Sequence, residues 1–318
     1  MKEQLHIGVL RGGASTRYDI SLKSGHALQV ALEGSCVVHD IFVDKRGVWH
    51  RRGVAVTPEK ALQGIDVAFN AMHGTYGEDG TLQKILSSLG VPYTGADAFA
   101  AATALDRAHA KEVLKKIPET RMPLHHVVSH YAGMHYAEKS HEIFSYFGPP
   151  YIVKALHGGT HEHVRVGKTL HDLPKAIHAV ATATQDDVLV EQHEKGVHIS
   201  CHVISGFRGK THYTTVPSQK VYDNGVNVSA QAPAQVTTAM KKRIEDAAVY
   251  VHTTLNLGHV SESHFIATER SLFFLSVDTS PLLTTASPLQ VSLEAVGSSL
   301  GEYAQHLIAA ALATKRYE

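Results

Sequence analysis

Short apolar runs alternate with amphipathic stretches through the first third of the chain. Continuous apolar residues predict strands at 7–10, 37–43 and 67–72, and an apolar stripe of helical spacing predicts a helix at 22–32. Strands and helices in alternation are typical of a small parallel sheet covered by helices. His73 leaves the third strand at its C-terminal end, which is the edge where open α/β sheets bind ligands. The pattern therefore predicts an α/β unit with a candidate site near this histidine.

The remainder of the chain predicts longer helices between pairs of strands. Helices are predicted at 98–117, 171–184, 236–255 and 291–312, strands at 151–155, 187–192 and 197–205, and a hairpin at 263–277. The stretch 217–233 is rich in Ser, Asn, Gln and Gly and lacks periodicity, so we expect a mobile loop there. A length of 318 residues is enough for two or three domains.

The composition is that of an ordinary globular protein, with 43% hydrophobic and 19% charged residues. Thirty basic and thirty acidic residues cancel, so the net charge favours neither nucleic acid nor a membrane surface as a partner. No apolar run is long enough to cross a bilayer, and the chain passes from Met-Lys-Glu-Gln directly into a strand, which argues against a secretory signal. Cys36 and Cys201 form neither a disulfide framework nor a zinc motif. We therefore expect a cytoplasmic protein.

Histidine is the one unusual residue type, with 24 copies. His157, His161 and His163 share one loop, and His198 and His202 share one face of a predicted strand. Imidazole suits zinc, copper or nickel as a ligand, but scattered histidines are more often surface polar residues. We favour the surface interpretation over a dedicated metal site, and we expect the net charge to vary with pH between about 5 and 7.

The most informative stretch is the turn and helix that follow the strand at 67–72. His73 precedes Glu78 and Asp79, and Gly80 opens a helix whose apolar residues lie on one face. A histidine exposed beside a carboxylate can be held in one tautomer and offered to a substrate. The alternative is a surface turn with incidental polar residues, and this stretch alone does not decide between the two.

Several sequence blocks, taken in order, resemble one known family. The blocks are HIGVLRGGASTRYDISLKSG at the start, HGTYGEDGTLQ followed by LGVPYTG, then ALDRAHAKEVL, YIVKALHGGT, VLVEQHEKG and finally LFFLSVDTSPLLTTAS. They resemble the D-alanine–D-alanine ligases of the ATP-grasp superfamily and cover most of the chain. The resemblance implies an α/β (α+β) ATP-grasp fold, with an N-terminal parallel-sheet domain at 1–96 and two antiparallel-sheet subdomains, central at 97–185 and C-terminal at 186–318, that hold a nucleotide between them.

The resemblance also implies roles for individual residues. It implies ATP-dependent joining of two D-alanines for peptidoglycan synthesis, so nucleotide and amino acid are the expected partners, and it leaves a homodimer open. The positions that match the family's catalytic pattern are His73, Glu78, Thr160 and Ser287. The positions that correspond to nucleotide contacts are Arg107, Lys154, Glu191, Gln192, His193 and His198.

Other positions depart from the family pattern. His264, Ser276 and Asp278 stand where the family has an aspartate, a glutamate and an asparagine that hold Mg²⁺, a hard ion that prefers carboxylate oxygens. Arg17 replaces a glutamate that would hold the ammonium of the first D-alanine, and Glu262 replaces an arginine that would stabilise the acyl-phosphate carbonyl. Asp278 and His264 stay open as ligands of a borderline metal such as Zn²⁺ or Mn²⁺, but we favour loss of the metal site.

Three functional hypotheses follow from the resemblance and the departures. We expect a D-alanine–D-alanine ligase homologue that binds ATP and whose Mg²⁺ site is uncertain. We expect its ligase activity to be weak or lost, because each swapped charge costs a few kcal/mol and about 1.4 kcal/mol is tenfold in rate. The first alternative is a non-catalytic ATP-grasp protein that binds a nucleotide or a protein partner. The second is an ATP-grasp ligase with a different carboxylate and amine.

Overall fold

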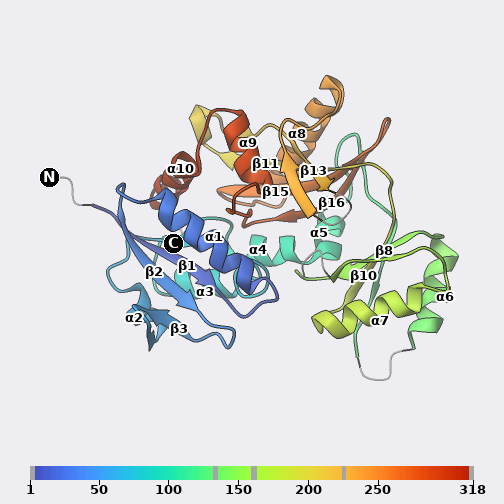
Figure 1. Cartoon of the computed structure of the whole chain (residues 1–318), viewed down its shortest axis with the longest axis horizontal. Coiled ribbons are helices and arrows are strands. Elements are labelled where there is room, and N and C mark those ends of the chain that lie inside the picture. Colours follow the sequence, from blue (N-terminus) through green and yellow to red (C-terminus); the bar gives the residue numbers. More distant parts are fainter. Residues whose placement is uncertain (1–3, 132–134, 159–162, 224–226, 315–318) are drawn as a thin grey trace.

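The structure, a computed structural model, describes residues 4–131, 135–158, 163–223 and 227–314. Three β-sheets and the helices that cover them make up this part of the chain (Figure 1). The first sheet comes from the start of the chain, the second from its middle and the third mainly from its last third. The mixed α/β (α+β) class expected from the sequence is confirmed.

The first sheet has the strand order β4-β3-β2-β1-β5. Its strands are β1 (His6–Gly12), β2 (Val37–Val43), β3 (Trp49–Arg51), β4 (Val54–Val56) and β5 (Val67–Asn70), and its helices are α1 (Tyr18–Ala31), α2 (Pro58–Leu62) and α3 (Thr81–Ser88). β1 runs parallel to both β2 and β5, as the alternation of strand and helix predicted. β3 and β4 extend the sheet as antiparallel strands. The carboxyl ends of β1 and β5 therefore meet at one edge.

The predicted helix at 98–117 is two helices, α4 (Ala98–Leu105) and α5 (Arg107–Leu114). Asp106 between them has an extended backbone, and its side chain accepts hydrogen bonds from the backbone N–H groups of Ala108 and His109. A carboxylate that caps a new N-terminus in this way ends one helix and starts the next, although the apolar pattern continues through it. The break turns Arg107 toward the second sheet.

The second sheet is antiparallel, in the order β7-β10-β8-β9. Its strands are β7 (His125–Val128), β8 (Tyr151–Ala155), β9 (Arg165–Gly167) and β10 (Val188–Gln192), and the helices α6 (Tyr136–Tyr146) and α7 (Leu173–Thr184) cover it. Val153, Ile177 and Val190 belong to its core. The subdomain boundaries after residues 96 and 185 remain a proposal; β10, just beyond the second, pairs within this sheet.

The third sheet has the strand order β14-β13-β11-β15-β16-β6, with β12 paired to β11. Its strands are β6 (Thr120–Arg121), β11 (Val197–Ser205), β12 (His212–Thr214), β13 (Ser218–Asp223), β14 (Asn227–Gln231), β15 (Val260–Ala267) and β16 (Leu272–Asp278). A 3₁₀ turn (Phe207–Gly209) and the helices α8 (Thr238–Thr254), α9 (Pro288–Ala295) and α10 (Leu300–Ala313) complete this part. The predicted late hairpin is confirmed as β15 and β16.

Two predictions for this last part are wrong. Residues 217–233 were expected to form a mobile loop, but they include β13 and β14, which pair with each other and, through Gln219 and Ile199, with β11. Backbone hydrogen bonds to a neighbouring strand need no apolar pattern, so the polar composition hid them. The predicted final helix is two helices, and Ser299 caps the second by accepting a hydrogen bond from the N–H of Glu302.

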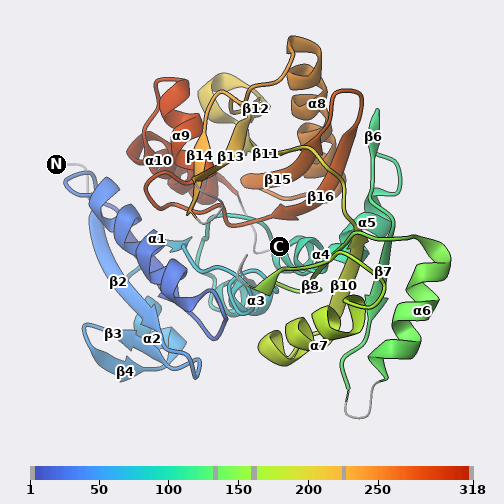
Figure 2. The same ribbon diagram turned by 45° about the vertical axis from the view of Figure 1, so that its right-hand side comes forward.

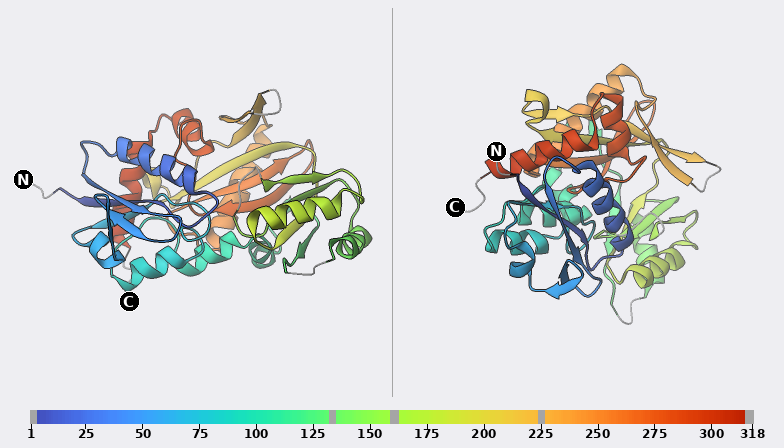
Figure 3. Two further views of the ribbon diagram at one scale, coloured as in Figure 1. Left: turned by 60° about the horizontal axis from the view of Figure 1, so that its bottom comes forward. Right: turned by 60° about the vertical axis from the view of Figure 1, so that its left-hand side comes forward.

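Each sheet forms one unit with the helices that cover it, and the three units pack against one another. Figure 2 shows the first sheet with α1 on one side, the second sheet with α6 and α7 on the other, and the third sheet with α8 above both. Figure 3 places the first and second sheets at opposite ends of the long axis. One apolar core joins Ile7, Leu28 and Phe69 of the first unit to Leu289 and Leu307 of α9 and α10. Within the described residues, no helix is long and apolar enough to span a membrane.

Candidate functional site

The loop after β5 is held in shape by its own side chains. Asn70 donates a hydrogen bond from its amide to the carbonyl of Gly77 at 2.9 Å and accepts one from the N–H of Met72 at 3.0 Å. Asp79 accepts from the N–H groups of Tyr76 and Thr81 and so fixes the start of α3. The Asx-type bonds make this a rigid turn, and it projects its polar residues toward the third sheet.

His73 lies in this turn and is fully buried, whereas we expected an exposed histidine. Its Nδ1 lies 3.0 Å from the carbonyl oxygen of Ser280, and its Nε2 lies 2.7 Å from the hydroxyl of Ser24. A carbonyl only accepts, so Nδ1 carries the proton and Nε2 accepts from the serine. Burial, together with nearby Arg17, lowers the pKa of His73 to about 3. Nδ1 therefore joins the N-terminal unit to the segment after β16, and Nε2 joins the turn to α1.

Glu78 connects the same two units. One carboxylate oxygen accepts a hydrogen bond from the N–H of Gly74, and the other accepts from the N–H of Ser280 at 3.1 Å. Burial and the nearby carboxylate of Asp278 raise the pKa of Glu78 to about 7, against the opposing effect of Arg17. Glu78 is therefore a buried, hydrogen-bonded group that titrates near neutrality.

Arg17 is the cation at the centre of this arrangement. Its Nη1 lies 3.6 Å from a carboxylate oxygen of Glu78 and 3.8 Å from Oδ2 of Asp278. Burial opposes its positive charge, but Asp278, Glu78 and Glu262 together raise the pKa of the guanidinium. Arg17 thus faces carboxylates from both the first unit and the third sheet.

The third sheet supplies a row of charges on β15 and β16. Glu262 lies opposite Asp278 and His264 lies opposite Ser276 in the strand register. His264 Nε2 lies 3.3 Å from Asp278 Oδ2, and its Nδ1 lies 3.8 Å from Glu262 Oε1. Burial opposes ionisation of both acids. Neighbouring histidines nevertheless lower the pKa of Glu262 to about 2. His264 and Arg17 hold the pKa of Asp278 far below its usual range.

The buried His202 extends this row by one step. Its Nε2 lies 3.5 Å from the second oxygen of Glu262, and its Nδ1 lies 3.2 Å from the hydroxyl of Thr215. His198, four residues earlier on β11, is only partly buried, and burial followed by the nearby Lys220 lowers its pKa to about 4. Each carboxylate of the row therefore has a cationic or imidazole neighbour.

These residues do not fit a magnesium ion. The candidate donors are one carboxylate, of Asp278, with the imidazole of His264 and the hydroxyl of Ser276, whereas Mg²⁺ favours carboxylate and water oxygens in an octahedral shell. Arg17 lies within 4 Å of the same carboxylate and competes for its charge. Across the ranges that the structure describes, no group of three or more His, Cys, Asp or Glu side chains is arranged to hold a metal ion.

A second charged cluster lies between α5 and the second sheet. Lys154 Nζ on β8 lies 2.6 Å from one oxygen of Glu191 on β10, and Lys111 of α5 contacts the other oxygen. Burial lowers the pKa of Lys154 to about 8, although Glu191 opposes the shift; for Glu191, the two lysines outweigh burial and lower its pKa to about 2. Arg107 donates from Nη1 to the carbonyls of Ala155 and Leu156 at 2.8 and 3.2 Å.

Lys111 was missed by the sequence reasoning. It is the fully buried lysine of α5, 80 residues from Glu191 in the chain. The available signal was its place one helical turn after Arg107 on a helix face that also carries Ala110 and Leu114, both buried. A lysine on an apolar face needs an acidic partner, but the sequence does not say which acid supplies it.

The other predicted site residues are placed separately. Gln192 donates its backbone N–H to the carbonyl of Leu124 at 2.8 Å, and His193 donates its own to Pro150 at 3.0 Å, so this segment is held by main-chain bonds. Ser287 caps α9 by accepting from the N–H of Gln290. Thr160 lies outside the described residues.

The His-rich loop is described only in part, because His161 also lies outside the described residues. His157 forms a hydrogen bond from Nδ1 to Asp186 at 2.9 Å, and its Nε2 lies 3.6 Å from Asp106. The bond to Asp186, ahead of the opposing effect of burial, raises the pKa of His157. This histidine thus joins the α4–α5 break to the end of the second sheet.

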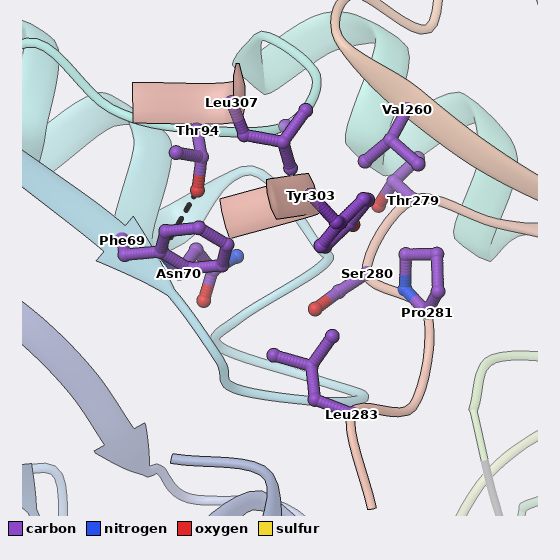
Figure 4. A pocket seen from close by; sticks show the side chains of 11 residues that line it. Phe69, Asn70, Thr94, Val260, Thr279, Ser280, Pro281, Leu283, Tyr303 and Leu307 are labelled. Carbon is purple, nitrogen blue, oxygen red and sulfur yellow. Dashed lines mark hydrogen bonds between the residues drawn. The ribbon is translucent and has the colours of Figure 1, made fainter. Parts of the chain in front are cut away.

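A small cavity adjoins the His73 contact and shares Ser280 with it (Figure 4). Figure 4 shows side chains from the first unit and from α10 facing each other across this space. Its lining residues are Phe69, Asn70, Thr94, Gly95, Val260, Thr279, Ser280, Pro281, Leu283, Tyr303 and Leu307. The cavity belongs to the junction of the first and third units.

Solved structures share this architecture. The D-alanine–D-alanine ligase from Coxiella burnetii superposes with a TM-score of 0.83 at 22% identity, covering 98% of this chain and 94% of the other. The VanG D-Ala:D-Ser ligase from Enterococcus faecalis gives a TM-score of 0.81 at 21% identity, covering 97% of this chain and all of the other. The three-unit arrangement is therefore an ATP-grasp fold.

Sequence comparison identifies the family within that fold. Residues 52–96 match the family model for the D-ala D-ala ligase N-terminus, and residues 117–309 match that for the C-terminus. The D-alanine–D-alanine ligase of Geobacter sulfurreducens is 30% identical over 315 residues, covering 96% of this chain and 93% of the relative. That of Agrobacterium fabrum is 29% identical over 323 residues, with 95% and 96% covered. The chain belongs to the D-alanine–D-alanine ligase family, as its sequence blocks predicted.

Proposed function

We propose that this chain is a nucleotide-binding member of the family in which the joining of two D-alanines is weak or lost. The observation that carries the proposal is the position of Arg17 between Glu78 and Asp278. A cation paired with acids now stands where the family resemblance implies a carboxylate for the substrate ammonium. The relatives with similar sequences are named as D-alanine–D-alanine ligases. The joining of two D-alanines is therefore the activity against which this chain is compared.

The nucleotide part of the proposal rests on the second cluster. Lys154 lies near the end of β8, and Arg107 at the start of α5 places its guanidinium on the carbonyls of Ala155 and Leu156. Both offer positive charge for the phosphates of ATP. The backbone at Glu191, Gln192 and His193 follows as an ordered strand end, and the family resemblance implies that this segment contacts adenine. Recognition through the main chain depends little on which side chains these positions carry.

The loss of ligation follows from the charges of the first cluster. Activation of a D-alanine carboxylate and attack by a second amine need an anion near each ammonium and a cation or N–H donor near the developing oxyanion. Arg17 would repel the first ammonium, and Glu262 would repel the oxyanion. Two such reversals, at about 1.4 kcal/mol for each tenfold change in rate, are enough to reduce turnover by orders of magnitude.

The test compares this protein with the Geobacter sulfurreducens ligase under identical conditions. Purified protein is incubated with ATP, Mg²⁺ and D-alanine, and phosphate release and D-alanyl-D-alanine are measured by coupled assay and mass spectrometry. We expect little or no dipeptide together with a thermal shift caused by ATP. Turnover at the relative's rate contradicts the proposal, and so does the absence of any nucleotide binding.

A second candidate function is supported by the same arginine. Arg17 would attract an acidic group, so the alternative is a ligase whose first substrate carries an acidic group in place of the ammonium. A panel that replaces the first D-alanine by dicarboxylates without an amine, such as methylmalonate or succinate, separates the two, with D-alanine kept as the second substrate and ADP release as the readout. ADP release only with the dicarboxylates supports the alternative, and no release with any member supports the non-ligating protein.

A further inference from the structure

We propose that the site takes its nucleotide without a divalent metal ion, with the guanidinium of Arg17 in place of the metal. The inference rests on the proposed nucleotide binding, and it adds that the nucleotide binds as the metal-free polyphosphate. It starts from Asp278, whose Oδ2 has two neighbours in the structure, Arg17 at 3.8 Å and His264 at 3.3 Å. The carboxylate that remains from the family's metal positions is thus already engaged by nitrogen groups of the chain.

The loop around Arg17 holds the backbone of this residue in place. The N–H of Arg17 donates to the hydroxyl of Ser15 at 2.9 Å, and that hydroxyl donates to the carbonyl of His73 at 2.7 Å. Ser21 donates two hydrogen bonds to the carbonyl of Arg17, one from its N–H and one from its hydroxyl. The backbone of the arginine is therefore fixed to both the first helix and the turn after β5.

Gly74 shows how closely the turn surrounds the arginine side chain. A Cβ at this position would lie 3.3 Å from Cδ of Arg17 and 3.2 Å from the hydroxyl of Ser15, at a backbone φ of +76°. The close approach and the left-handed backbone both favour glycine. The turn leaves space for the arginine stem, and the guanidinium extends beyond it to the carboxylates.

The charges around this point favour a free polyphosphate over a metal complex. A divalent ion at Asp278 would lie within a few ångströms of the Arg17 guanidinium, and like charges at that separation repel strongly in a site of low dielectric. A phosphate oxygen gains the opposite sign of interaction from Arg17 and from Arg107, whose charge interacts with those of Asp278 and Arg17. Lys154 adds a positive charge beside Glu191. A fixed arginine can provide the charge neutralisation that a metal ion provides in other phosphate sites.

The experiment measures the affinity for an N-methylanthraniloyl derivative of ATP by fluorescence, once with EDTA and once with excess Mg²⁺. We expect Kd to differ by less than about threefold between the two conditions for the unaltered full chain. Binding that requires Mg²⁺ overturns the inference and leaves the proposed nucleotide binding intact. No binding in either condition overturns the proposed function itself, so the two failures are distinguishable.

Variants assign the effect to Arg17. Arg17→Gln should weaken binding in EDTA by about tenfold or more, Arg17→Lys should retain most of it, and Arg46→Gln, on an exposed turn, should leave it unchanged. The triple variant Arg17→Glu, His264→Asp, Ser276→Glu should bind about tenfold more tightly with Mg²⁺ than with EDTA. Unchanged binding by Arg17→Gln in EDTA overturns the assignment. If Arg17→Gln does not fold, loss of EDTA binding in a folded Arg17→Lys protein, checked by circular dichroism, also overturns it.

Discussion

The guanidinium of Arg17 lies 3.6 Å from the carboxylate of Glu78, and only 16% and 3% of these side chains are exposed. The pair joins the loop after β1 to the turn after β5, and Asp278 adds a third member from β16. A buried ion pair is costly to break because the partner that remains loses its counter-charge in a low-dielectric site. The relationship therefore gives direct predictions for stability and its dependence on pH.

Replacing Arg17 by Gln should destabilise the fold. The change leaves the carboxylates of Glu78 and Asp278 near each other without the cation between them, and we expect a loss of about 3 kcal/mol in the free energy of unfolding at pH 8. Urea unfolding followed by tryptophan fluorescence and circular dichroism measures it. The matched control is Arg46→Gln, because Arg46 is 83% exposed and pairs with Asp44 at the surface. Equal stability of the two variants would contradict the prediction.

Replacing Glu78 by Gln should change the pH dependence of stability. Burial and Asp278 raise the pKa of Glu78 from 4.5 to about 7. Between these values the folded state binds more protons than the unfolded state, so the contribution of Glu78 is favourable below pH 4.5 and is lost as the pH rises through 7. The variant should therefore gain stability relative to the parent as the pH rises from 4.5 to 8, on the order of 2 kcal/mol.

The measurement for Glu78 is a series of urea titrations at pH 4.5, 6, 7 and 8, and the quantity compared is the difference between variant and parent. The exposed Glu59 provides the control, since Glu59→Gln should show a nearly constant difference over the same range. A difference for Glu78→Gln that falls with rising pH would exclude the assigned direction of the pKa shift.

Glu191 should behave in the opposite way. Lys111 and Lys154 outweigh burial and lower its pKa from 4.5 to about 2, so the unfolded state binds more protons between these values. Stability from Glu191 is present above pH 4.5 and is lost on acidification toward pH 2. Glu191→Gln also leaves two buried ammonium groups without a shared carboxylate, and we expect a loss of about 3 kcal/mol at pH 7.

The Glu191 prediction is checked by thermal and urea unfolding between pH 2 and 7. Relative to Glu191→Gln, the parent should lose its advantage as the pH falls below 4.5. Glu112→Gln is the control, because Glu112 is exposed on the same helix as Lys111. A loss of stability that is the same for both substitutions would show that Lys111 and Lys154 do not depend on Glu191.

The sequence was sufficient for the elements that carry a periodic apolar pattern. The strand at β5 and the helix after it were predicted because Phe69 lies in a continuous apolar run and Leu82 and Leu86 repeat at helical spacing. Both predictions are confirmed. The hairpin of β13 and β14 was not predicted, since it is held by backbone pairing to β11 and carries no comparable alternation. The break at Asp106 was missed because a cap is a local hydrogen bond inside an otherwise helical sequence.

The site was predictable by residue type but not by partner. The family resemblance singled out Arg17, Glu262 and Asp278 as departures, yet their meeting with Glu78 depends on how the first unit packs on the third sheet. His73 was expected to be exposed. It is buried, and its ring contacts Ser280 and Ser24, which come from distant parts of the chain. Pairings across such separations are set by tertiary packing, which single-sequence patterns do not encode.

His73 gives the last prediction, since its buried neutral ring must resist protonation. Burial and Arg17 lower its pKa from 6.5 to about 3, so the unfolded state binds more protons in this window and stability falls as the pH drops below 6.5. In His73→Asn, a side-chain amide can still donate to the carbonyl of Ser280 but does not titrate. The parent's stability relative to this variant should therefore fall by up to about 1.4 kcal/mol per pH unit between 6.5 and 4. Urea titrations at pH 4, 5, 6 and 7.5 measure this difference in stability, and His109→Asn is the control because His109 is exposed. A difference independent of pH would mean that the His73 ring accepts a proton in the folded state as readily as in the unfolded chain.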